Sequence, residues 1–587
     1  MMRLRIPYRL VSACLALFGL ALLLFARTGT FDFVNLDDWK YVSECPWLRD
    51  GITRASFVNC FTEFRDTGCW FPLTRLSYLL DVALAGMNPG TMHIHNVVLH
   101  GFNTVLVFLF LRMLLKKRLN SRGNSAQSTG IDDGLFLCAL ALGALFWALH
   151  PLRVESVAWI ASRKDMLSLF WELLALMAWI KGMESPLKRY AILPALFFVL
   201  AMMAKPAAIT CVVLVALLDL FLLGEFRWRR YLPLALLTLP WIVISVYTQH
   251  IVRGSDANCV LYVPFYGRFV QGIGSVGLYL VQTCWPVNLY VPALYRWPQM
   301  PDYFWLGLVV CLATCMAFAR YVWSMFSRKQ EHSALSWLVF CMLGYLVAVS
   351  PMLGIVSFGF QAHADRFTCL PSVFMAAGIT GTLYWISQRR KVYSYMGWGL
   401  MALCCMALAW VSVQQLSYWR DTESLSRRAL QFEPDNVIAH KNLGAHLFLK
   451  RGRQEEAEKH FERAMMLHRD ALTYIVGITL FVANGNRTRA TAMSEQFVGT
   501  VRERETQGWK VHACIAEAFQ AYCKGDWALA EENFKVVAQK NPTFAPALYM
   551  LGNCALKRGD KAACEKYWNV ARQDVMFRSW LQKRPPP

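Results

Sequence analysis

The chain has 587 residues, of which 56% are hydrophobic and 14% aromatic, and its net charge is +21. Soluble domains contain about 45–50% apolar residues, so this composition excludes a chain that is soluble throughout. A large positive charge also occurs in nucleic-acid-binding proteins, but here much of the basic charge lies between apolar runs and no basic–aromatic nucleic-acid-binding motif stands out. We therefore expect no nucleic-acid partner, and we expect the lipid bilayer to account for the charge pattern.

Apolar runs recur from the N-terminus to about residue 415, and each is about long enough to cross a hydrocarbon core of about 30 Å. The first run is longer than the core of a typical signal peptide and no small-residue cleavage site follows it, so we interpret it as an uncleaved span. The runs predict about eleven membrane spans: 10–26, 95–115, 134–150, 166–181, 190–204, 207–223, 231–247, 303–320, 334–350, 370–387 and 395–414.

Basic segments between the runs predict the orientation of the chain. They fall on one side of the membrane if the spans alternate: 1–9, 116–122, 181–189, 225–230, 320–329 and 388–391. The positive-inside rule places that side, and the N-terminus, in the cytoplasm. An odd number of spans places the C-terminal region on the external side. This assignment requires residues 269–291, which contain several Gly and Gln, to lie in the membrane interface as a helix.

Polar segments gather on the predicted external face. The first external loop, 27–93, is large and contains the adjacent pair Asp37 and Asp38 in "FVNLDDWKYV". Residues 150–165 and 358–367 mix charges of both signs with His, Glu and Gln. Charged side chains at membrane ends are often anchors, but a mixture of signs on one face predicts a water-facing cavity.

The C-terminal region changes character. A linker at 416–433 precedes residues 434–580, whose helical pattern has a period near 34. Turn glycines recur at Gly452, Gly485, Gly525 and Gly559. Small residues such as Ala518 and Gly552, and large ones such as Phe534 and Trp568, repeat at the same interval. The pattern predicts about four tetratricopeptide-type helix pairs, the second being degenerate, around 470–500. The fold-class prediction is all-α: a polytopic membrane domain, 1–415, followed by a solenoid.

Several motifs occur in a fixed order before the repeats: "FVNLDDWKYV", "WFPLTRLSYLLD", "MHIHNVVLHGFNTVLVF", "HPLRVESVAWIASRKDMLS", "LAMMAKPAAIT", "WPVNLYV" and "QAHADRFTCLPS". Over nearly its whole length the chain resembles bacterial relatives of the transmembrane and tetratricopeptide-repeat protein O-mannosyltransferases. The resemblance implies a GT-C fold in the bacterial inner membrane. It also implies inverting transfer of a mannose-like sugar from a polyprenyl-phosphate donor to Ser or Thr hydroxyls of external acceptor proteins. Arg153, Phe367 and Cys369 depart from the family pattern, which leaves donor and acceptor specificity open.

Sugar transfer to a hydroxyl requires a general base, and Asp37 or Asp38 is the predicted one. The second carboxylate is expected to orient the first, or the two could together hold a divalent cation that screens the phosphate. The sequence does not choose between the two residues or between these roles. An exposed acidic turn or helix cap is the structural alternative.

Cations are expected around the leaving phosphate. The predicted donor-binding residues are Arg163, Lys164, Lys205 and Arg366. Lys205 stands alone at the outer end of a span, where membrane anchoring is the alternative role. For Arg366 the alternative is a structural ion pair with its neighbour Asp365.

Seven further polar residues are predicted to line the cavity: His93, Asn96, His150, Glu155, Asp165, Gln361 and Asp365. His93 and Asn96 share one helical face, and polar contact between helices is the alternative there. The Walker phosphate loop and the GxSxG motif are absent from the sequence, which argues against an ATP-driven pump, a nucleotide donor bound by such a loop, and a serine hydrolase. No cofactor is predicted beyond the divalent cation considered above.

Two other functions fit parts of the pattern. The same chemistry could serve a lipid or glycan acceptor instead of a protein. A non-catalytic membrane scaffold could present the repeats to partner proteins, in which case the acidic and basic residues on the predicted external face would be dispensable. The convergence of those residues on one face, far in sequence from the repeats, favours the enzyme.

Overall fold

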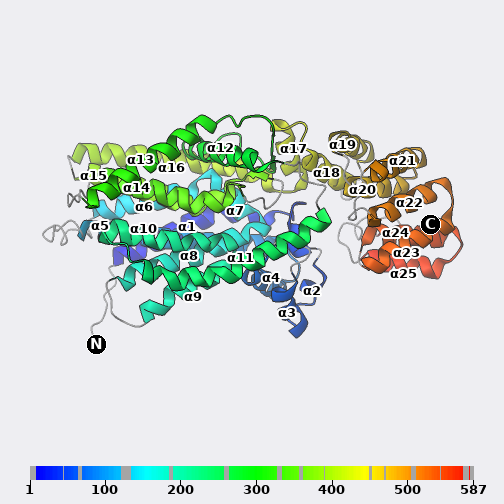
Figure 1. Ribbon diagram of the computed structural model, residues 1–587, viewed down its shortest axis with the longest axis horizontal. Helices are drawn as coiled ribbons and strands as arrows, with labels where there is room; N and C mark the ends of the chain where they lie inside the picture. The colour runs from blue at the N-terminus through cyan, green and yellow to red at the C-terminus, as the bar shows by residue number, and fades with distance from the viewer. Residues whose placement is uncertain are drawn as a thin grey trace.

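The computed structural model describes residues 8–43, 45–63, 69–120, 134–183, 189–256, 263–326, 334–355, 361–388, 391–448, 453–468, 471–503, 510–542, 544–572 and 581. Helices dominate these residues, and two very short strands are the exception. Figure 1 shows two parts in a row: a bundle of long helices and, at the C-terminal end, a stack of shorter ones. The predicted all-α fold class is confirmed.

A helix coincides with each apolar run that was predicted to cross the membrane. Most of these helices run along the long axis of the bundle (Figure 1). They are α1 (Tyr8–Phe25), α5 (Pro89–Asn120), α6 (Gly134–Leu149), α8 (Arg163–Gly182), α9 (Arg189–Ala204), α10 (Cys211–Leu223), α11 (Trp228–Asp256), α13 (Phe304–Phe326), α14 (Ala334–Val349), α15 (Pro371–Ser387) and α16 (Lys391–Leu416).

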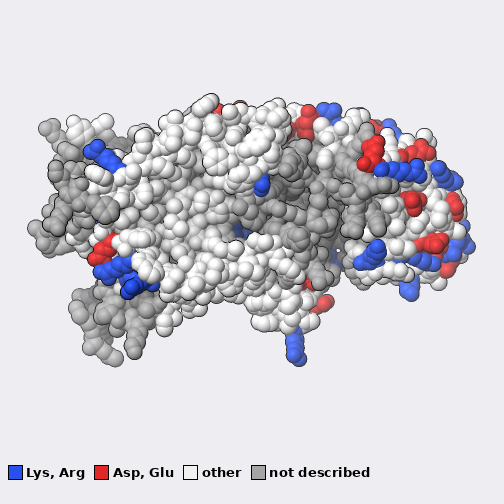
Figure 2. All heavy atoms as spheres, in the orientation of Figure 1, with Lys and Arg blue, Asp and Glu red and all other residues white. Residues whose placement is uncertain are grey.

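Seven helices in the described residues are long and apolar enough to cross a membrane. An eighth is reached if α6 and α7 (Val154–Ala158), which are bent by 55° relative to each other, count as one broken span. Few charged side chains are visible on the bundle surface in Figure 2, whereas they are dense on the C-terminal stack. The chain is therefore an integral, multi-pass membrane protein. Eleven spans stays a prediction, because α8, α9 and α15 do not meet the same criteria of length and composition.

The segment at 269–291 forms most of α12 (Phe265–Cys284) and the loop after it. This helix is not among the candidate spans in the described residues. Its glycines allow close packing on α13, since a Cβ on Gly277 would lie 2.3 Å from the carbonyl oxygen of Tyr303. Two aromatic side chains of the segment, Phe269 and Trp285, are exposed. Exposed aromatic rings suit the interfacial position that was predicted for this segment.

The large loop after α1 is mostly helical. It contains the short helices η1 (Ala26–Thr30), η2 (Trp39–Ser43), α2 (Pro46–Arg49), α3 (Arg54–Thr62) and α4 (Pro72–Ala85). A small core of its own holds these helices, including Val42, Tyr78 and Met92. Ile160 belongs to the same core, so the loop packs against the connection between α7 and α8.

Short elements connect the long helices near the predicted polar segments. They are η4 (Pro151–Arg153), η5 (Ile160–Ser162), η6 (Pro206–Thr210), η7 (Ser350–Met352) and η8 (Asp365–Thr368), together with the strands β1 (Ala293–Leu294) and β2 (Gln361–His363). The two strands pair antiparallel, with Ala293 opposite His363.

The C-terminal helices stack in pairs. After η9 (Ser417–Trp419) and α17 (Thr422–Phe432) come α18 (Val437–His446), α19 (Gln454–Leu467), α20 (Ala471–Ala483), α21 (Arg487–Glu503), α22 (Lys510–Lys524), α23 (Trp527–Lys540), α24 (Ala545–Lys557) and α25 (Lys561–Ala571). Gly485, Gly525 and Gly559 take positive φ angles of 74°, 91° and 83° in the turns within three pairs, as glycine allows without steric cost. Gly452 lies outside the described residues. Helical repeats are confirmed, and their assignment as tetratricopeptide repeats stays a prediction.

The second pair forms despite its degenerate sequence. Tyr474 on α20 stacks on Phe497 of α21, with ring centroids 5.0 Å apart. Gly477 lets Met493 approach, since a Cβ at Gly477 would lie 2.3 Å from the end of that side chain. Small and large residues therefore keep the spacing of the other pairs, although their identities differ.

Gly552 on α24 makes a similar close contact in the last pair. A Cβ at this position would lie 2.2 Å from the indole of Trp568 on α25, and the indole Nε1 donates to the carbonyl oxygen of Tyr549 at 3.1 Å. We expect Gly552→Ala to destabilise the chain by about 1–3 kcal/mol through overpacking. Thermal unfolding of the purified protein in detergent measures the change.

Gly499 on α21 is the matched control, because it is an exposed helical glycine and a Cβ added there would meet no other atom within 4 Å. Gly499→Ala is expected to stabilise the protein by about 0.5–1 kcal/mol, because alanine loses less backbone entropy than glycine in a helix. Equal effects of the two substitutions would contradict the packing described for Gly552.

Candidate functional site

The adjacent carboxylates Asp37 and Asp38 lie in the turn before η2 and face different surroundings. Asp38 is fully buried. Its Oδ2 accepts the Val34 amide at 3.0 Å and its Oδ1 accepts the Ala161 amide at 2.8 Å. The side chain of Asp37 is 35% exposed, and its Oδ2 lies 3.9 Å from the Nζ of Lys164. Asp38 thus ties the loop to the connection before α8, while Asp37 remains accessible.

Burial raises the pKa of Asp38 to about 7, against the two backbone amides and Lys164, which lower it. Both of its oxygens accept hydrogen bonds from the backbone. A proton acceptor for an incoming substrate needs a free lone pair within hydrogen-bond reach of that substrate. Of the two carboxylates, Asp37 meets this condition better.

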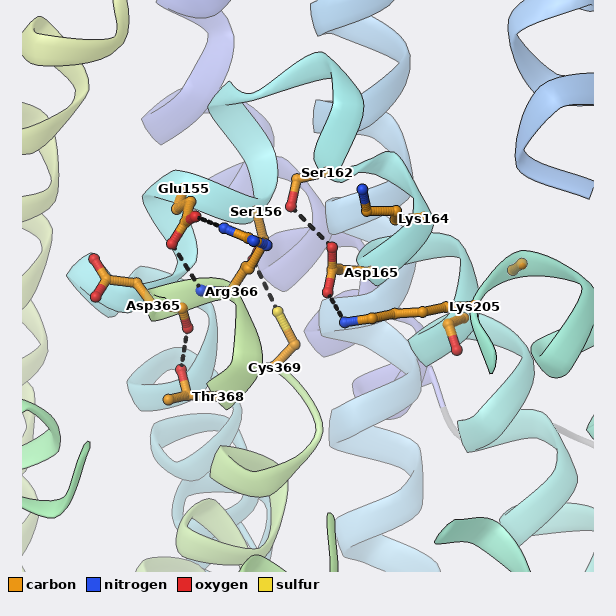
Figure 3. Close-up of polar contacts among 12 residues, drawn as sticks. Glu155, Ser156, Ser162, Lys164, Asp165, Lys205, Asp365, Arg366, Thr368 and Cys369 are labelled. Carbon is orange, nitrogen blue, oxygen red and sulfur yellow. Dashed lines mark hydrogen bonds and ion pairs between the residues drawn. The ribbon is translucent and has the colours of Figure 1, made fainter. Parts of the chain in front are cut away.

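Three of the four predicted cations come together from separate segments. Lys164 lies in the first turn of α8, Lys205 follows α9 directly, and Arg366 lies in η8. Lys205 forms an ion pair with Asp165, whose other oxygen accepts the Ser162 hydroxyl at 3.0 Å. Figure 3 shows Asp165 between Ser162 and Lys205, with Lys164 on the neighbouring turn.

Arg366 is held on its other side by acidic and amide oxygens. Its guanidinium forms an ion pair with Glu155, and its backbone N–H donates to Glu155 Oε2 at 3.0 Å. Gln361 Oε1 accepts from the same guanidinium at 2.6 Å. Figure 3 shows Glu155 and Arg366 side by side, linking α7 to η8.

Aromatic rings support the three cations. Lys164 Nζ lies 4.5 Å from the ring centroid of Tyr41. Phe367 lies under both Lys205, at 5.3 Å, and Arg366, at 4.7 Å. Cations over aromatic faces are stabilised by the ring quadrupole. Tyr41 was not predicted as a site residue, and Phe367 appeared only as a departure from the family pattern.

Electrostatic effects connect the carboxylates and cations. Burial lowers the pKa of Arg366, but Glu155, Asp165 and Asp37 raise it, and the net shift is upward. Asp37 therefore lies close enough to Arg366 to act on it, as well as on Lys164. We call the following six residues the charged cluster: Asp37, Glu155, Lys164, Asp165, Lys205 and Arg366.

Arg163, the fourth predicted cation, lies apart from this cluster. Its side chain is 3% exposed and forms an ion pair with Asp81 of α4. It also donates to Asn96 Oδ1 at 2.7 Å and to the carbonyl oxygen of Met92 at 2.8 Å. Arg163 joins α4, α5 and α8, so its predicted contact with a donor phosphate is not supported by its position.

Three of the seven predicted cavity residues contact backbone carbonyl groups of other segments, and a fourth, Asp365, is buried. Asn96 donates to the Trp159 carbonyl oxygen at 3.1 Å. His93 lies with its Nε2 3.5 Å from the Asp32 carbonyl oxygen, and His150 with its Nε2 3.0 Å from that of Thr283. Asp365 is buried, and burial together with Glu155 raises its pKa well above the usual range. Of the seven, Glu155 and Asp165 belong to the charged cluster, and Gln361 contacts it.

Asp37 and Asp38 do not present a pair of free carboxylates to the divalent cation considered above. Both oxygens of Asp38 accept backbone amides. Within the part of the chain that the structure describes, no group of three or more His, Cys, Asp or Glu side chains is arranged to hold a metal ion. Lysine and arginine side chains provide the positive charge at this place.

Fold and site together define a class: an all-α, multi-pass membrane protein with a charged cluster between its helix ends and with C-terminal helical repeats. No protein-family model matches the chain. It is 26% identical to Protein O-mannosyl-transferase Tmtc1 of Drosophila melanogaster over 67% of this chain and 53% of that protein. Identity to human TMTC1 is 23% over 78% of this chain and 55% of the relative. Identity to human TMTC4 is 24% over 76% of this chain and 64% of the relative.

The chain is thus a relative of the TMTC protein O-mannosyl-transferases over most of its own length, which confirms the resemblance in its motifs. It spans between about half and just under two thirds of the length of these relatives.

Proposed function

We propose that the chain is a protein O-glycosyltransferase that moves a mannose-like sugar from a polyprenyl-phosphate donor to Ser or Thr hydroxyls. The names of its relatives support the reaction class. The observation that carries the proposal is the placement of a partly exposed carboxylate, Asp37, beside Lys164 and near Arg366. A base and a set of cations in one place are what transfer from a phosphate ester to a hydroxyl requires.

Asp37 acts as the general base in this mechanism. Its carboxylate takes the proton of the acceptor hydroxyl while the hydroxyl oxygen forms a bond to the anomeric carbon. The bond from that carbon to the phosphate oxygen breaks on the opposite side, so the anomeric configuration inverts. The polyprenyl phosphate leaves with the electron pair of the broken bond. Asp38 holds the backbone of the loop that carries Asp37.

Lys164, Lys205 and Arg366 stabilise the charge on the leaving phosphate. Charge-assisted hydrogen bonds to phosphate oxygens are stronger than neutral ones. The ion pairs of Lys205 with Asp165 and of Arg366 with Glu155 hold these side chains in place before a donor arrives. Such preorganisation avoids a reorganisation cost at the moment of reaction.

The GT-C class and the orientation belong to the same proposal. The basic segments place the N-terminus in the cytoplasm and residues 434–580 on the periplasmic side of a bacterial inner membrane. Residues 1–415 form the membrane domain, and 416–433 link it to the repeats. The repeats, as tetratricopeptide-type units, bind acceptor proteins.

Product stereochemistry tests the proposal. The purified chain is incubated with polyprenyl-phosphate mannose and Ser/Thr peptides, and the glycopeptide linkage is determined by NMR. We expect sugar on the hydroxyl, in the anomeric configuration opposite to that of the donor. Retained configuration would contradict a single displacement with Asp37 as base. Sugar on lipid or glycan but not on peptide, or no transfer at all, would favour the other acceptor class or the scaffold.

A further inference from the structure

The segment that leads into the repeats contacts the loop that carries Asp37. The Thr422 hydroxyl oxygen accepts the backbone N–H of Asn35 at 2.8 Å, and the Arg420 carbonyl oxygen accepts that of Asp32 at 3.0 Å. Trp419 lies beside Trp159, with ring centroids 5.9 Å apart. Thr422 is 4% exposed. These contacts fix the start of the loop two residues before Asp37.

The other end of the same segment contacts the backbone on both sides of strand β1. Glu433 Oε1 accepts the Tyr290 hydroxyl at 2.9 Å and pairs with Arg296 at 3.1 Å. The ring of Phe432 stacks on that of Tyr290 at 5.3 Å, and Asn436 Nδ2 donates to the Pro292 carbonyl oxygen at 2.7 Å. The backbone around residues 290–296 is therefore bound to the C-terminal end of α17.

This backbone continues into the charged cluster. Strand β1, in the middle of it, pairs with β2, and Leu294 lies opposite Gln361. Gln361 accepts a hydrogen bond from Arg366 at 2.6 Å. A path of contacts thus runs from Glu433, whose Oε2 accepts the Leu294 N–H at 3.4 Å, through the paired strands to Gln361 and Arg366, while Thr422 contacts the loop of Asp37. The two ends of α17 therefore contact the segments that lead to Asp37 and to Arg366.

We infer that Thr422 and Glu433 are positioning residues of the sugar-transfer site, an inference that rests on the proposed function. Both side chains are buried or nearly so, and leaving a buried donor unpaired is costly. Displacement of a reacting group by about 1 Å can cost on the order of a hundredfold in rate. Helix α17, which precedes the repeats, therefore helps to position the reacting groups of the site.

Thr422→Val tests this inference most cleanly. Valine keeps the shape of threonine but cannot accept the Asn35 N–H, and the N-cap of α17 is Asp421, which the change leaves intact. We expect kcat for peptide glycosylation to fall about tenfold, with an unchanged KM for the peptide. Thr422→Ser, which keeps the hydroxyl, should restore most of the rate. Equal loss in both variants, or wild-type kcat in Thr422→Val, would overturn the inference.

Arg427→Gln is the matched control on the same helix. Arg427 forms ion pairs with Glu423 of the same helix and with Glu456 of α19, and its replacement should leave kcat unchanged. Glu433→Gln removes the charge that holds Arg296 and is expected to lower kcat as Thr422→Val does. A wild-type rate in Glu433→Gln would remove that residue from the inference.

Hydrogen exchange provides a readout that does not depend on activity. The Asn35 amide is expected to exchange faster in Thr422→Val than in wild type, with Arg427→Gln unchanged. If the wild-type chain transfers no sugar, the proposed function fails, whereas exchange still reports whether Thr422 fixes the loop. If Asp37→Asn abolishes transfer and Thr422→Val exchanges and reacts as wild type, the positioning inference alone fails.

Discussion

Replacing Asp37 by Asn should lower the rate of sugar transfer by about 10²–10⁴-fold, the usual contribution of a positioned general base. The amide has nearly the same shape but cannot take a proton from the acceptor hydroxyl. The side chain of Asp37 is 35% exposed, and its ion pair with Lys164 is long, at 3.9 Å. The fold should therefore tolerate the change. Initial rates with a labelled donor, at matched amounts of folded protein, measure the loss.

Substitutions of two other aspartates serve as controls. Asp50→Asn, at the exposed residue that follows α2, should leave the rate unchanged. Asp38→Asn should instead destabilise the protein by about 1–3 kcal/mol, because an amide nitrogen would face a backbone N–H. A wild-type rate in Asp37→Asn, in correctly folded protein, would remove this residue from the mechanism.

Loss of the Lys205 cation should have the second largest effect. Removing one group that stabilises developing negative charge typically costs about 10²–10³-fold in kcat. The single change Lys205→Met would also leave Asp165 buried without its ion-pair partner, which destabilises a fold by about 3–5 kcal/mol. The informative variant is therefore the double change Lys205→Met with Asp165→Asn, which removes both charges.

We expect the double variant to unfold at a temperature near that of wild type and still to transfer sugar about a hundredfold more slowly. Lys205→Arg, which keeps the charge, should retain more activity than Lys205→Met. Recovery of the wild-type rate in the double variant would mean that Lys205 only neutralises Asp165, and it would contradict a role at the phosphate.

Apolar runs and turn residues made the helices predictable. Each predicted span coincides with a helix because a run of about 20 apolar residues has few other ways to satisfy its backbone in a membrane. The turns at Gly485, Gly525 and Gly559 were also predictable, since positive φ angles favour glycine. The pair α20 and α21 looked degenerate because its packing uses Met493 and Phe497 in place of the residues in the later units.

Side-chain partners were much less predictable. Arg163 and Lys164 are neighbours in the sequence, yet Arg163 is buried against Asp81 and Lys164 reaches Asp37. Which of two adjacent residues faces the site depends on the direction of α8 relative to α4, and periodicity does not contain that information. The same holds for Asp37 and Asp38, whose environments differ because a backbone amide at Ala161 binds only Asp38.

Thr422 and Glu433 carried no sequence signal. Both lie in residues 416–433, which were predicted to be a linker and have an ordinary helix-forming composition. Their partners, Asn35 and Arg296, are more than a hundred residues away in the chain. Contacts of this kind arise from tertiary packing and become visible only when the segments are seen together.

A structure of the chain with bound polyprenyl phosphate is the most direct test of the central idea, that one carboxylate and three cations form a single sugar-transfer site. We predict that the phosphate oxygens lie within hydrogen-bond distance of Lys205 and Arg366, on the side of the cluster that faces Asp37. A phosphate bound elsewhere in the bundle, with Asp37 and Arg366 facing separate surfaces, would contradict it.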